Sequence, residues 1–335
     1  MSQGTSERRW LIGISDYLVS PADLEQEAFP EAEFVFLSDW RSSDAAREQW
    51  RQVDALLVWR FQIDAATAGL LSETCKIVVR YGVGYDLIDI PALTEARVPF
   101  CNTPDYGTEE VADTACAMIL ALQRKILHYD QDCRRYQEDW QGHLLKPHQR
   151  TSQQTLGLIG VGRIGTAVIN RMKAFGFKIL GYDPYQPSGH EKAVGYGRVH
   201  TIDELLEQAD IVSLHCPLTD ETRGMIDAGF LGRMKQGAAL VNTARGGIID
   251  SLDCIEEALR THHLAAVAFD VLPHEPPQPH SLLSAWRSNE SWLIGRMIVN
   301  PHSAYYSEQG WVEMRYKAAE TARLFLLEGK LRNQC

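Results

Sequence analysis

The sequence TLGLIGVGRIGTAVINRMKAFGFKILGYD occupies residues 155–183 of a chain of 335 residues. It begins with a short apolar run at 156–159, which is typical of a buried strand. After a glycine-rich turn, residues 164–175 have the apolar periodicity of a helix. A second apolar run at 178–182 then ends in an acidic residue. The stretch therefore predicts a strand, a turn, a helix and a second strand in succession.

The turn contains three glycines, Gly160, Gly162 and Gly165, in the spacing G-x-G-x-x-G. In a dinucleotide-binding turn the first glycine permits the tight bend, the second lets the backbone approach a pyrophosphate, and the third lets helix pack on strand. The helix N-terminus then favours an anion. Asp183 follows Gly160 by 23 residues, where a carboxylate binds the adenosine ribose and repels a 2′-phosphate. This context predicts NAD as the cofactor, although a glycine turn alone occurs in many α/β proteins.

The composition, with 45% apolar and 23% charged residues, is typical of a globular protein, and 335 residues are enough for two domains. The net charge of −11 without a basic tract argues against nucleic acid or an anionic membrane surface as partner. No run of 18 apolar residues occurs, and we expect neither a membrane span nor a signal peptide. The seven cysteines form no CxxC pair, which favours reduced thiols in a cytoplasmic protein without a metal site.

Short apolar runs alternate with helical segments on both sides of the central stretch, which predicts parallel sheets covered by helices. The other expected strands lie at residues 10–14, 34–37, 55–58, 77–80, 98–102, 211–215, 238–242, 265–270 and 298–300. Pro21 is expected to open the first helix, with Ser20 as its cap. The last helix, near 308–328, is expected to return to the first domain, because the dinucleotide unit begins in mid-chain.

Three charged or titratable residues lie beyond predicted strands in the second half of the chain: Arg245, Glu275 and His302. A charge at the end of a buried strand is costly unless it has a function there. Arginine binds a carboxylate bidentately and polarises a carbonyl, and histidine exchanges a proton with an alcohol near neutral pH. A glutamate hydrogen-bonded to a histidine ring fixes its tautomer. Taken singly, each residue also has an ordinary interpretation, as a surface ion pair, a solvated carboxylate or a loop imidazole.

Six segments of the chain together resemble the D-2-hydroxyacid dehydrogenases, and among them the C-terminal binding proteins and their bacterial relatives. The segments are RYGVGYDLIDIPAL from Arg80, CNTPDYGTEEVADTACAMILAL from Cys101, TLGLIGVGRIGTAV with GYDPY, VNTARGGIID from Val241, AFDVLPHEPP from Ala268 and NPHSAYYSEQ from Asn300. The resemblance implies two Rossmann-like α/β domains with parallel sheets. It implies a central NAD-binding domain, residues 106–303, inserted into a discontinuous flavodoxin-like catalytic domain of residues 1–105 and 304–335. It also implies a homodimer that pairs through the central domain.

The same resemblance implies an NAD-dependent oxidoreductase that transfers a hydride between NADH and the carbonyl of a small 2-keto acid. The catalytic residues that it implies are Arg245, Glu275 and His302. For the substrate it implies the amides of Val83 and Gly84, with Tyr81, Arg245 and Tyr305 as further contacts. The cofactor contacts that it implies are Thr108, Gly160, Gly162, Arg163, Ile164, Gly165, Asp183, Cys216, Thr243, Ala244, Arg245, Asp270 and His302.

Two departures from the family pattern leave questions open. Tyr305 stands where the C-terminal binding proteins carry Trp, so their pocket for a bulky substrate is not expected here. The stretch between Glu275 and His302 is longer than usual, and its insertion, Pro276 to Trp292, either covers the site as a lid or elaborates the surface. Which 2-keto or 2-hydroxy acid reacts, and in which direction, is left open.

The alternative function is a binding module, an NADH-sensing corepressor like the animal C-terminal binding proteins. It predicts a peptide cleft in the N-terminal domain. The segment PADL at 21–24 resembles the ligand motif of those proteins, but the start of a helix explains it better. A formate-dehydrogenase-like activity is disfavoured, because that group uses Gln where this chain has Glu275.

Overall fold

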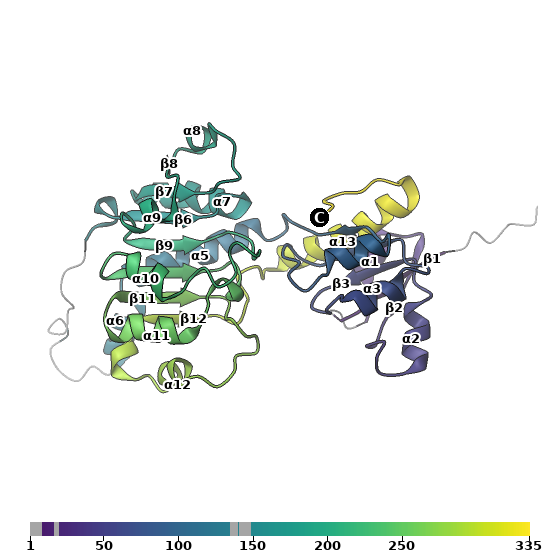
Figure 1. Cartoon of the computed structure of the whole chain (residues 1–335), viewed down its shortest axis with the longest axis horizontal. Coiled ribbons are helices and arrows are strands. Elements are labelled where there is room, and N and C mark those ends of the chain that lie inside the picture. The colour runs from purple at the N-terminus through teal and green to yellow at the C-terminus, as the bar shows by residue number, and fades with distance from the viewer. Residues whose placement is uncertain (1–8, 17–19, 135–139, 141–148) are drawn as a thin grey trace, which may run out of the picture. The chain divides into compact units, whose positions relative to one another are not determined.

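The computed structural model describes residues 9–16, 20–134, 140 and 149–335 (Figure 1). The chain divides into two compact units. The outer unit combines Met1–Gly107 with Tyr306–Cys335, and the inner unit is Thr108–Tyr305. Each unit contains one sheet of parallel strands, so the predicted fold class is confirmed. No helix in the described part of the chain is long and apolar enough to cross a membrane.

The outer unit is built on a five-stranded sheet with the order β2-β1-β3-β4-β5. This is the order of flavodoxin-like folds, which bind ligands outside the carboxyl ends of their strands. The strands are β1 (Trp10–Ile14), β2 (Ala32–Phe36), β3 (Ala55–Val58), β4 (Ile77–Arg80) and β5 (Phe100–Cys101). The helices are α1 (Asp23–Ala28), α2 (Asp44–Trp50), α3 (Ala65–Leu71), α4 (Ile90–Glu95) and α13 (Glu308–Glu328).

Helix α13 completes the outer unit, as expected, although it follows the whole inner unit in sequence. In Figure 1 this helix lies among the N-terminal elements, and it packs on α1 and β4. Arg315 on α13 donates to both carboxylate oxygens of Glu25 on α1, at 2.9 and 2.6 Å. Tyr81, directly after β4, donates its hydroxyl to the same carboxylate at 3.1 Å. Because Glu25 is fully buried, these two donors compensate its charge and join three distant parts of the chain.

The start of α1 differs from the prediction. The helix begins at Asp23 with Ala22 at the N-cap position, and no side chain caps it. The prediction that Ser20 caps a helix beginning at Pro21 is therefore wrong. The buried pairing of Glu25 determines where this helix sits, and tertiary contacts override the local capping signal.

The inner unit is built on a seven-stranded sheet with the order β12-β11-β10-β9-β6-β7-β8. The strands are β6 (Thr155–Ile159), β7 (Lys178–Tyr182), β8 (Gly197–Arg198), β9 (Ile211–Leu214), β10 (Ala238–Asn242), β11 (Leu264–Phe269) and β12 (Met297–Val299). The α-helices are α5 (Thr108–Gln123), α6 (Ile126–Arg134), α7 (Arg163–Met172), α8 (His190–Val194), α9 (Ile202–Leu206), α10 (Ala228–Arg233), α11 (Leu252–Arg260) and α12 (Ser281–Arg287). The described residues of this unit also form four short 3₁₀ helices: η1 (Thr151–Gln153), η2 (Lys173–Phe175), η3 (Gly246–Ile248) and η4 (Ser291–Leu293).

The strand order of the inner sheet places a topological switch between β6 and β9. From β6 the chain moves outward through β7 and β8, and it then continues on the other side from β9 to β12 (Figure 1). Open parallel sheets bind dinucleotides at the carboxyl ends of the strands at such a switch. Separate apolar clusters pack against the sheet, one containing Val168 of α7 and the other Phe230 of α10. The loops after β6, β7, β9, β10, β11 and β12 therefore meet at one edge of a sheet anchored by helices.

The predicted strands agree with the structure to within two residues at each end. The sequence does not predict β8, which consists of Gly197 and Arg198 paired with β7. Two residues are too few to show the apolar periodicity on which such predictions depend.

Candidate active site

The turn after β6 requires glycine at two positions. Gly160 has φ +90°, in the left-handed region, and an added Cβ would lie 2.5 Å from the backbone nitrogen of Cys216. An added Cβ on Gly165 would lie 2.3 Å from the carbonyl oxygen of Gly160. Helix α7 therefore packs directly on the turn, where β6 and β9 end beside each other.

Gly162 has a different environment, because nothing lies within 4 Å of the position that a Cβ would take. It is the N-cap residue of α7, and no side chain caps this helix. The first N–H groups of the helix, from Arg163 and Ile164 onward, therefore lack an intrahelical or side-chain acceptor at the cap. Backbone donors, the positive end of the helix dipole and room for close approach together fit the pyrophosphate of a dinucleotide.

Asp183 lies at the end of β7 beside this turn. Its carboxylate accepts hydrogen bonds from the backbone nitrogens of Val161, at 2.7 Å, and Tyr185, at 3.0 Å. Each carboxylate oxygen has lone pairs beyond the one used here, and the side chain is only half-buried. The geometry therefore fits a carboxylate that is held in place to accept hydrogen bonds from the ribose hydroxyls of NAD.

The other side of the switch is formed by the end of β9. His215 shares a hydrogen bond of 2.9 Å between its Nε2 and the hydroxyl of Ser213, and its Nδ1 is buried with no partner among the described residues. Burial lowers the pKa of His215 to about 4, so the ring is neutral at physiological pH. Burial also raises the pKa of the neighbouring Cys216 thiol to about 11, which makes this cysteine an uncharged wall of the site.

Asn242, at the end of β10, shapes the loop that carries Thr243, Ala244 and Arg245. Its amide donates to the carbonyl of Arg245 at 3.0 Å and its carbonyl oxygen accepts from the nitrogen of Ala244 at 3.0 Å. The hydroxyl of Thr243 is buried and has no partner in the described ranges. A buried hydroxyl of this kind needs an acceptor or donor, and a bound dinucleotide would supply one.

The loops after β10 and β11 touch at Gly246. A Cβ at this position would lie 1.8 Å from the carbonyl oxygen of Leu272, so only glycine permits the approach. Arg245, which directly precedes it, is half-buried and donates from Nη1 to the carbonyl of Ala244 at 2.8 Å. The approach of Gly246 to Leu272 therefore brings the loop that carries Arg245 against the loop that leads to Glu275.

Glu275 and His302 form a pair at the carboxyl end of the sheet. Nδ1 of His302 and Oε2 of Glu275 lie 2.7 Å apart, and the other carboxylate oxygen accepts from the nitrogen of Leu272 at 3.0 Å. The two side chains are 30% and 29% exposed, so the pair is reachable from solvent. Because the carboxylate accepts a hydrogen bond from Nδ1–H, Nε2 is the ring nitrogen left to exchange a proton. His302 has φ +54°, an unusual backbone conformation for a residue other than glycine.

Asp270, the residue after β11, holds the loop that carries His302. Its carboxylate accepts from the backbone nitrogens of Ser303, at 2.9 Å, and Ala304, at 3.1 Å. Its carbonyl oxygen accepts from the nitrogen of His302 at 2.8 Å. Burial raises the pKa of the Asp270 carboxyl, while these N–H donors and His302 act in the opposite direction. These contacts hold the loop that carries His302, and contact of Asp270 with the cofactor stays a prediction.

The predicted substrate contacts are distributed over both units. In the outer unit, Asn102 donates to the carbonyl of Val83 at 2.7 Å, which holds the glycine loop after β4. The ring of Tyr81 is fully buried in that unit, with its hydroxyl on Glu25, so its side chain is part of the core. In the inner unit, the rings of Tyr305 and His302 meet edge to face with centroids 6.3 Å apart. Contact of Val83 and Gly84 with a substrate stays a prediction.

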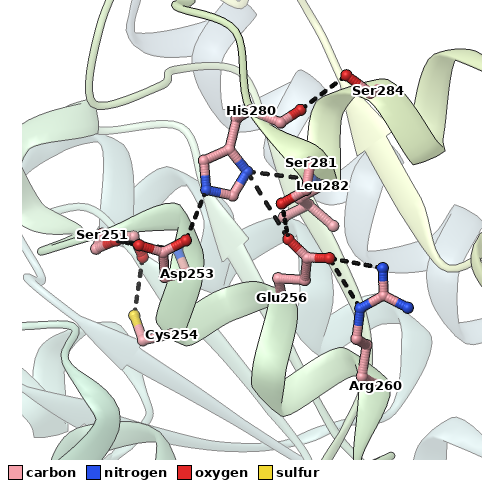
Figure 2. A network of polar contacts seen from close by, with 9 residues as sticks. All are labelled: Ser251, Asp253, Cys254, Glu256, Arg260, His280, Ser281, Leu282 and Ser284. Atoms are coloured by element: carbon pink, nitrogen blue, oxygen red, sulfur yellow. Dashed lines mark hydrogen bonds and ion pairs between the residues drawn. The ribbon is translucent and has the colours of Figure 1, made fainter.

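The insertion after Glu275 is anchored on α11, as Figure 2 shows. His280 is the N-cap residue of α12, and its Nδ1 accepts from the nitrogen of Leu282 at 3.1 Å. Its Nε2 lies 3.0 Å from Oδ1 of Asp253 on α11. Because Nδ1 accepts a hydrogen bond, Nε2 carries the proton, and a neutral ring satisfies both partners.

A second set of contacts fastens the same insertion. Glu256 on α11 accepts hydrogen bonds from the hydroxyl of Ser281 and from Nε of Arg260, the latter at 2.8 Å (Figure 2). Burial acts to raise the pKa of Glu256, but the hydrogen bonds from Ser281 and Arg260 outweigh it and lower this pKa. The guanidinium of Arg260 also lies 4.1 Å from the ring centroid of Trp292. Both ends of the insertion are therefore tied to one helix.

Within the described residues no group of three His, Cys, Asp or Glu side chains could hold a metal ion. The glycine turn, Asp183, Arg245, Glu275 and His302, which the sequence singled out, all lie in loops at the carboxyl edge of the inner sheet. Sequence reasoning missed Asn242, whose only signal is its place at a strand end.

Comparison with known proteins identifies relatives of the whole arrangement. The sequence model of the family "D-isomer specific 2-hydroxyacid dehydrogenase, NAD binding domain" matches residues 116–304. C-terminal-binding protein 1 of Caenorhabditis elegans is 36% identical over 257 residues, which are 75% of this chain and 34% of that protein. D-3-phosphoglycerate dehydrogenase of Methanocaldococcus jannaschii is 37% identical over 238 residues, which are 71% of this chain and 43% of that protein.

Among solved structures, a glyoxylate reductase from Paecilomyes thermophila superposes with a TM-score of 0.83 and 26% identity. The match covers 97% of this chain and 98% of that one. The chain thus spans less than half the length of the two curated relatives, but nearly the whole of this structural neighbour.

Proposed function

Because the chain belongs to the family of D-isomer specific 2-hydroxyacid dehydrogenases, we propose that it is an oxidoreductase that interconverts a 2-keto acid and a D-2-hydroxy acid. Its cofactor is NAD, in agreement with the prediction from the glycine turn and Asp183. The substrate class rests on the family and on the chemistry of the site.

One observation carries the proposal: a proton-exchanging imidazole and a guanidinium lie on loops that the fold forces together. The hydrogen bond of 2.7 Å from His302 to Glu275 sets the tautomer of the ring. The contact between Gly246 and Leu272 brings Arg245 to the same edge of the sheet. A general acid, its orienting carboxylate and a cation for a carboxylate substrate are the groups that reduction of a 2-keto acid needs.

The proposed mechanism assigns each side chain a role. The guanidinium of Arg245 binds the substrate carboxylate and polarises the neighbouring carbonyl. A reduced NAD held by the glycine turn and Asp183 would supply a hydride to the carbonyl carbon. His302 gives the proton on Nε2 to the carbonyl oxygen as it becomes an alkoxide, and in the oxidative direction it accepts that proton from the alcohol. Glu275 stabilises the positive charge on the ring whenever both nitrogens are protonated.

The proposed cofactor contacts follow the same edge of the inner sheet. The turn around Gly162 binds the pyrophosphate, and Asp183 binds the adenosine ribose. Thr243 offers its buried hydroxyl, and Asp270 holds the loop of His302 against the site. The remaining proposed contacts are Thr108, Gly160, Arg163, Ile164, Gly165, Cys216, Ala244, Arg245 and His302.

The test is turnover of NADH with a panel of 2-keto acids that range from glyoxylate and pyruvate to branched and aromatic members. We expect oxidation of NADH with at least one member, and loss of this activity in His302→Asn. Binding of NADH without turnover of any member, in either direction, would reject the proposed reaction and leave the cofactor assignment intact.

A second candidate function is a corepressor-like binding module that responds to NADH. The observation that favours it is the 36% identity to C-terminal-binding protein 1. The distinguishing experiment is a pull-down with immobilised peptides that contain Pro-Ala-Asp-Leu, with and without NADH. Retention of the protein only in the presence of NADH would support this candidate, and no retention would remove it.

A further inference from the structure

Two loops at the carboxyl edge of the inner sheet are bridged across the topological switch. The loop after β7 begins with Asp183, and the loop after β9 begins with His215. Strand β6 lies between β7 and β9, so a link between these two loops passes over the end of β6 and its glycine turn. The adenosine half of a dinucleotide lies on this side of the switch, because Asp183 is the residue suited to its ribose.

The link is a hydrogen bond between the hydroxyl of Tyr185 and Oε2 of Glu221, at 2.5 Å. The hydroxyl of Tyr185 donates to Glu221, and this hydrogen bond raises the pKa of Tyr185. The backbone nitrogen of Tyr185 also donates to Asp183 at 3.0 Å. Tyr185 therefore contacts both carboxylates, one through its backbone and one through its hydroxyl.

The loop after β9 presents Glu221 in a defined conformation. The hydroxyl of Thr222 donates to the carbonyl of Pro217 at 2.7 Å and accepts from the nitrogen of Thr219 at 2.9 Å. The nitrogen of Arg223 donates to the carbonyl of Thr219 at 2.9 Å. Glu221 lies inside this closed turn, with its side chain exposed toward Tyr185. Ordering of the turn reduces the entropy lost when the two side chains pair.

We propose that Tyr185 and Glu221 form a clasp over the adenosine end of NAD, and that Glu221 is a second carboxylate that selects against NADP. The two residues of this clasp have different effects on cofactor binding. The hydroxyl of Tyr185 closes the clasp and slows release of the cofactor. The charge of Glu221 adds to that of Asp183 and repels a 2′-phosphate, which carries nearly two negative charges at neutral pH. The inference rests on the proposed function only in that NAD is the cofactor, and it holds whichever acid reacts.

The experiment compares Kd values of NADH and NADPH by fluorescence titration, without any substrate, for the wild type, Glu221→Gln and Tyr185→Phe. Glu221→Gln keeps a side chain that can bond the phenol but removes the charge. We expect it to lower the ratio of the NADPH Kd to the NADH Kd by about three- to ten-fold at low ionic strength, and by less in about 0.5 M salt. Tyr185→Phe should leave this ratio unchanged and raise the NADH dissociation rate, measured by stopped flow, about two- to five-fold.

The matched control is Glu207→Gln, which removes the same charge at the end of α9, just before the amino end of β9 and therefore at the opposite edge of the sheet. This control should change neither the ratio nor the dissociation rate. A Kd ratio in Glu221→Gln equal to that of the control would overturn the role of Glu221. An unchanged dissociation rate in Tyr185→Phe would overturn the clasp. Both readouts are independent of turnover, so neither failure coincides with failure of the proposed reaction.

Discussion

Nδ1 of His302 and Oε2 of Glu275 lie 2.7 Å apart, although 27 residues separate them in sequence. The relationship determines which nitrogen of the ring is left to exchange a proton, because Nδ1–H donates its hydrogen bond to the carboxylate. The nitrogen of Leu272 holds the other oxygen of Glu275 at 3.0 Å, so the carboxylate itself is oriented.

Replacement of Glu275 by Gln should impair the reaction without impairing cofactor binding. The amide keeps the shape of the side chain but no longer stabilises a charged imidazole, so we expect kcat/KM to fall about 100-fold. The NADH Kd should stay within about two-fold of the wild-type value, because Glu275 contacts the imidazole of His302 and is not among the proposed cofactor contacts. The control is Glu257→Gln, an exposed position on α11. Wild-type kcat/KM in Glu275→Gln would contradict the proposed mechanism.

The two glycines Gly162 and Gly165 should respond differently to alanine. At Gly162 a Cβ would meet nothing within 4 Å. The free energy of unfolding of Gly162→Ala should therefore stay within about 1 kcal/mol of the wild-type value. Its methyl group would nevertheless take the room that a pyrophosphate needs, and NADH should bind at least about ten-fold more weakly. Gly165→Ala should lower the free energy of unfolding by about 1–3 kcal/mol, because the added Cβ would meet the backbone of Gly160.

Urea unfolding and fluorescence titration separate these two effects. A Gly162→Ala protein that is stable and binds NADH as tightly as the wild type would show that the pyrophosphate does not approach at this point.

His215 makes folding stability depend on pH. Burial lowers its pKa from 6.5 to about 4, so the native ring resists protonation that the unfolded chain accepts. Above pH 6.5 the ring is neutral in both states and the full stability is present. As the pH falls from 6.5 to about 4, the unfolded chain gains a proton that the native ring does not, and the free energy of unfolding falls by up to about 3 kcal/mol.

The measurement is the free energy of unfolding in urea at pH 7.5 and at pH 4.5, for the wild type and His215→Asn. The wild type should lose more stability on acidification than the variant does. Equal losses in the two proteins would assign the acid sensitivity to other groups.

A shallow apolar hollow on the inner unit is the surface on which we expect a second copy of this chain. It has a volume of about 480 Å³, and Ile126 and Phe175 beside it are 55% and 48% exposed. Its lining residues are Ala117, Leu120, Ala121, Arg124, Ile126, Thr151 and Phe175. An apolar surface of this kind on a domain through which the family is expected to pair favours a dimer contact.

Sedimentation velocity tests this contact. The wild type should sediment as a dimer and Phe175→Glu as a monomer, because a buried charge without a partner is costly at an interface. The control is Leu331→Glu, an exposed apolar residue of the outer unit. A dimer that persists in Phe175→Glu would place the contact elsewhere.

His280 should be a structural residue of the insertion. His280→Ala removes the cap of α12 and the link to Asp253, and we expect a loss of about 1–2 kcal/mol in the free energy of unfolding. Limited proteolysis should then cut the insertion, residues 276–292, sooner than in the wild type. If the insertion is a fixed surface element, kcat should be unchanged, and a large change in kcat would instead favour a lid.

The parts of the site that sequence predicts are those with local signals. Gly160 and Gly165 are required by backbone conformation and close approach, and both requirements show as spacing along the chain. Asp183 ends an apolar run at the distance that a strand and a helix impose. The buried strands can likewise be predicted from their apolar runs, whereas β8, with two residues, is too short to show such a run.

The contacts that sequence does not predict depend on which strands are neighbours. The approach of Gly246 to Leu272 requires that β10 and β11 lie side by side, and the bracing of the His302 loop by Asp270 requires the same of β11 and β12. The hydrogen bond between Tyr185 and Glu221 crosses β6, and no spacing along the chain indicates it.

The pairing of Glu25 with Arg315 has a consequence for biosynthesis. The ribosome makes the acid 290 residues before its basic partner, so α1 emerges with a carboxylate that cannot be buried favourably until α13 has been made. The inner unit is contiguous and has all its strands by then, and it is free to fold while still tethered. We therefore expect nascent chains stalled before α13 to contain a protease-resistant inner unit joined to a protease-sensitive N-terminal segment.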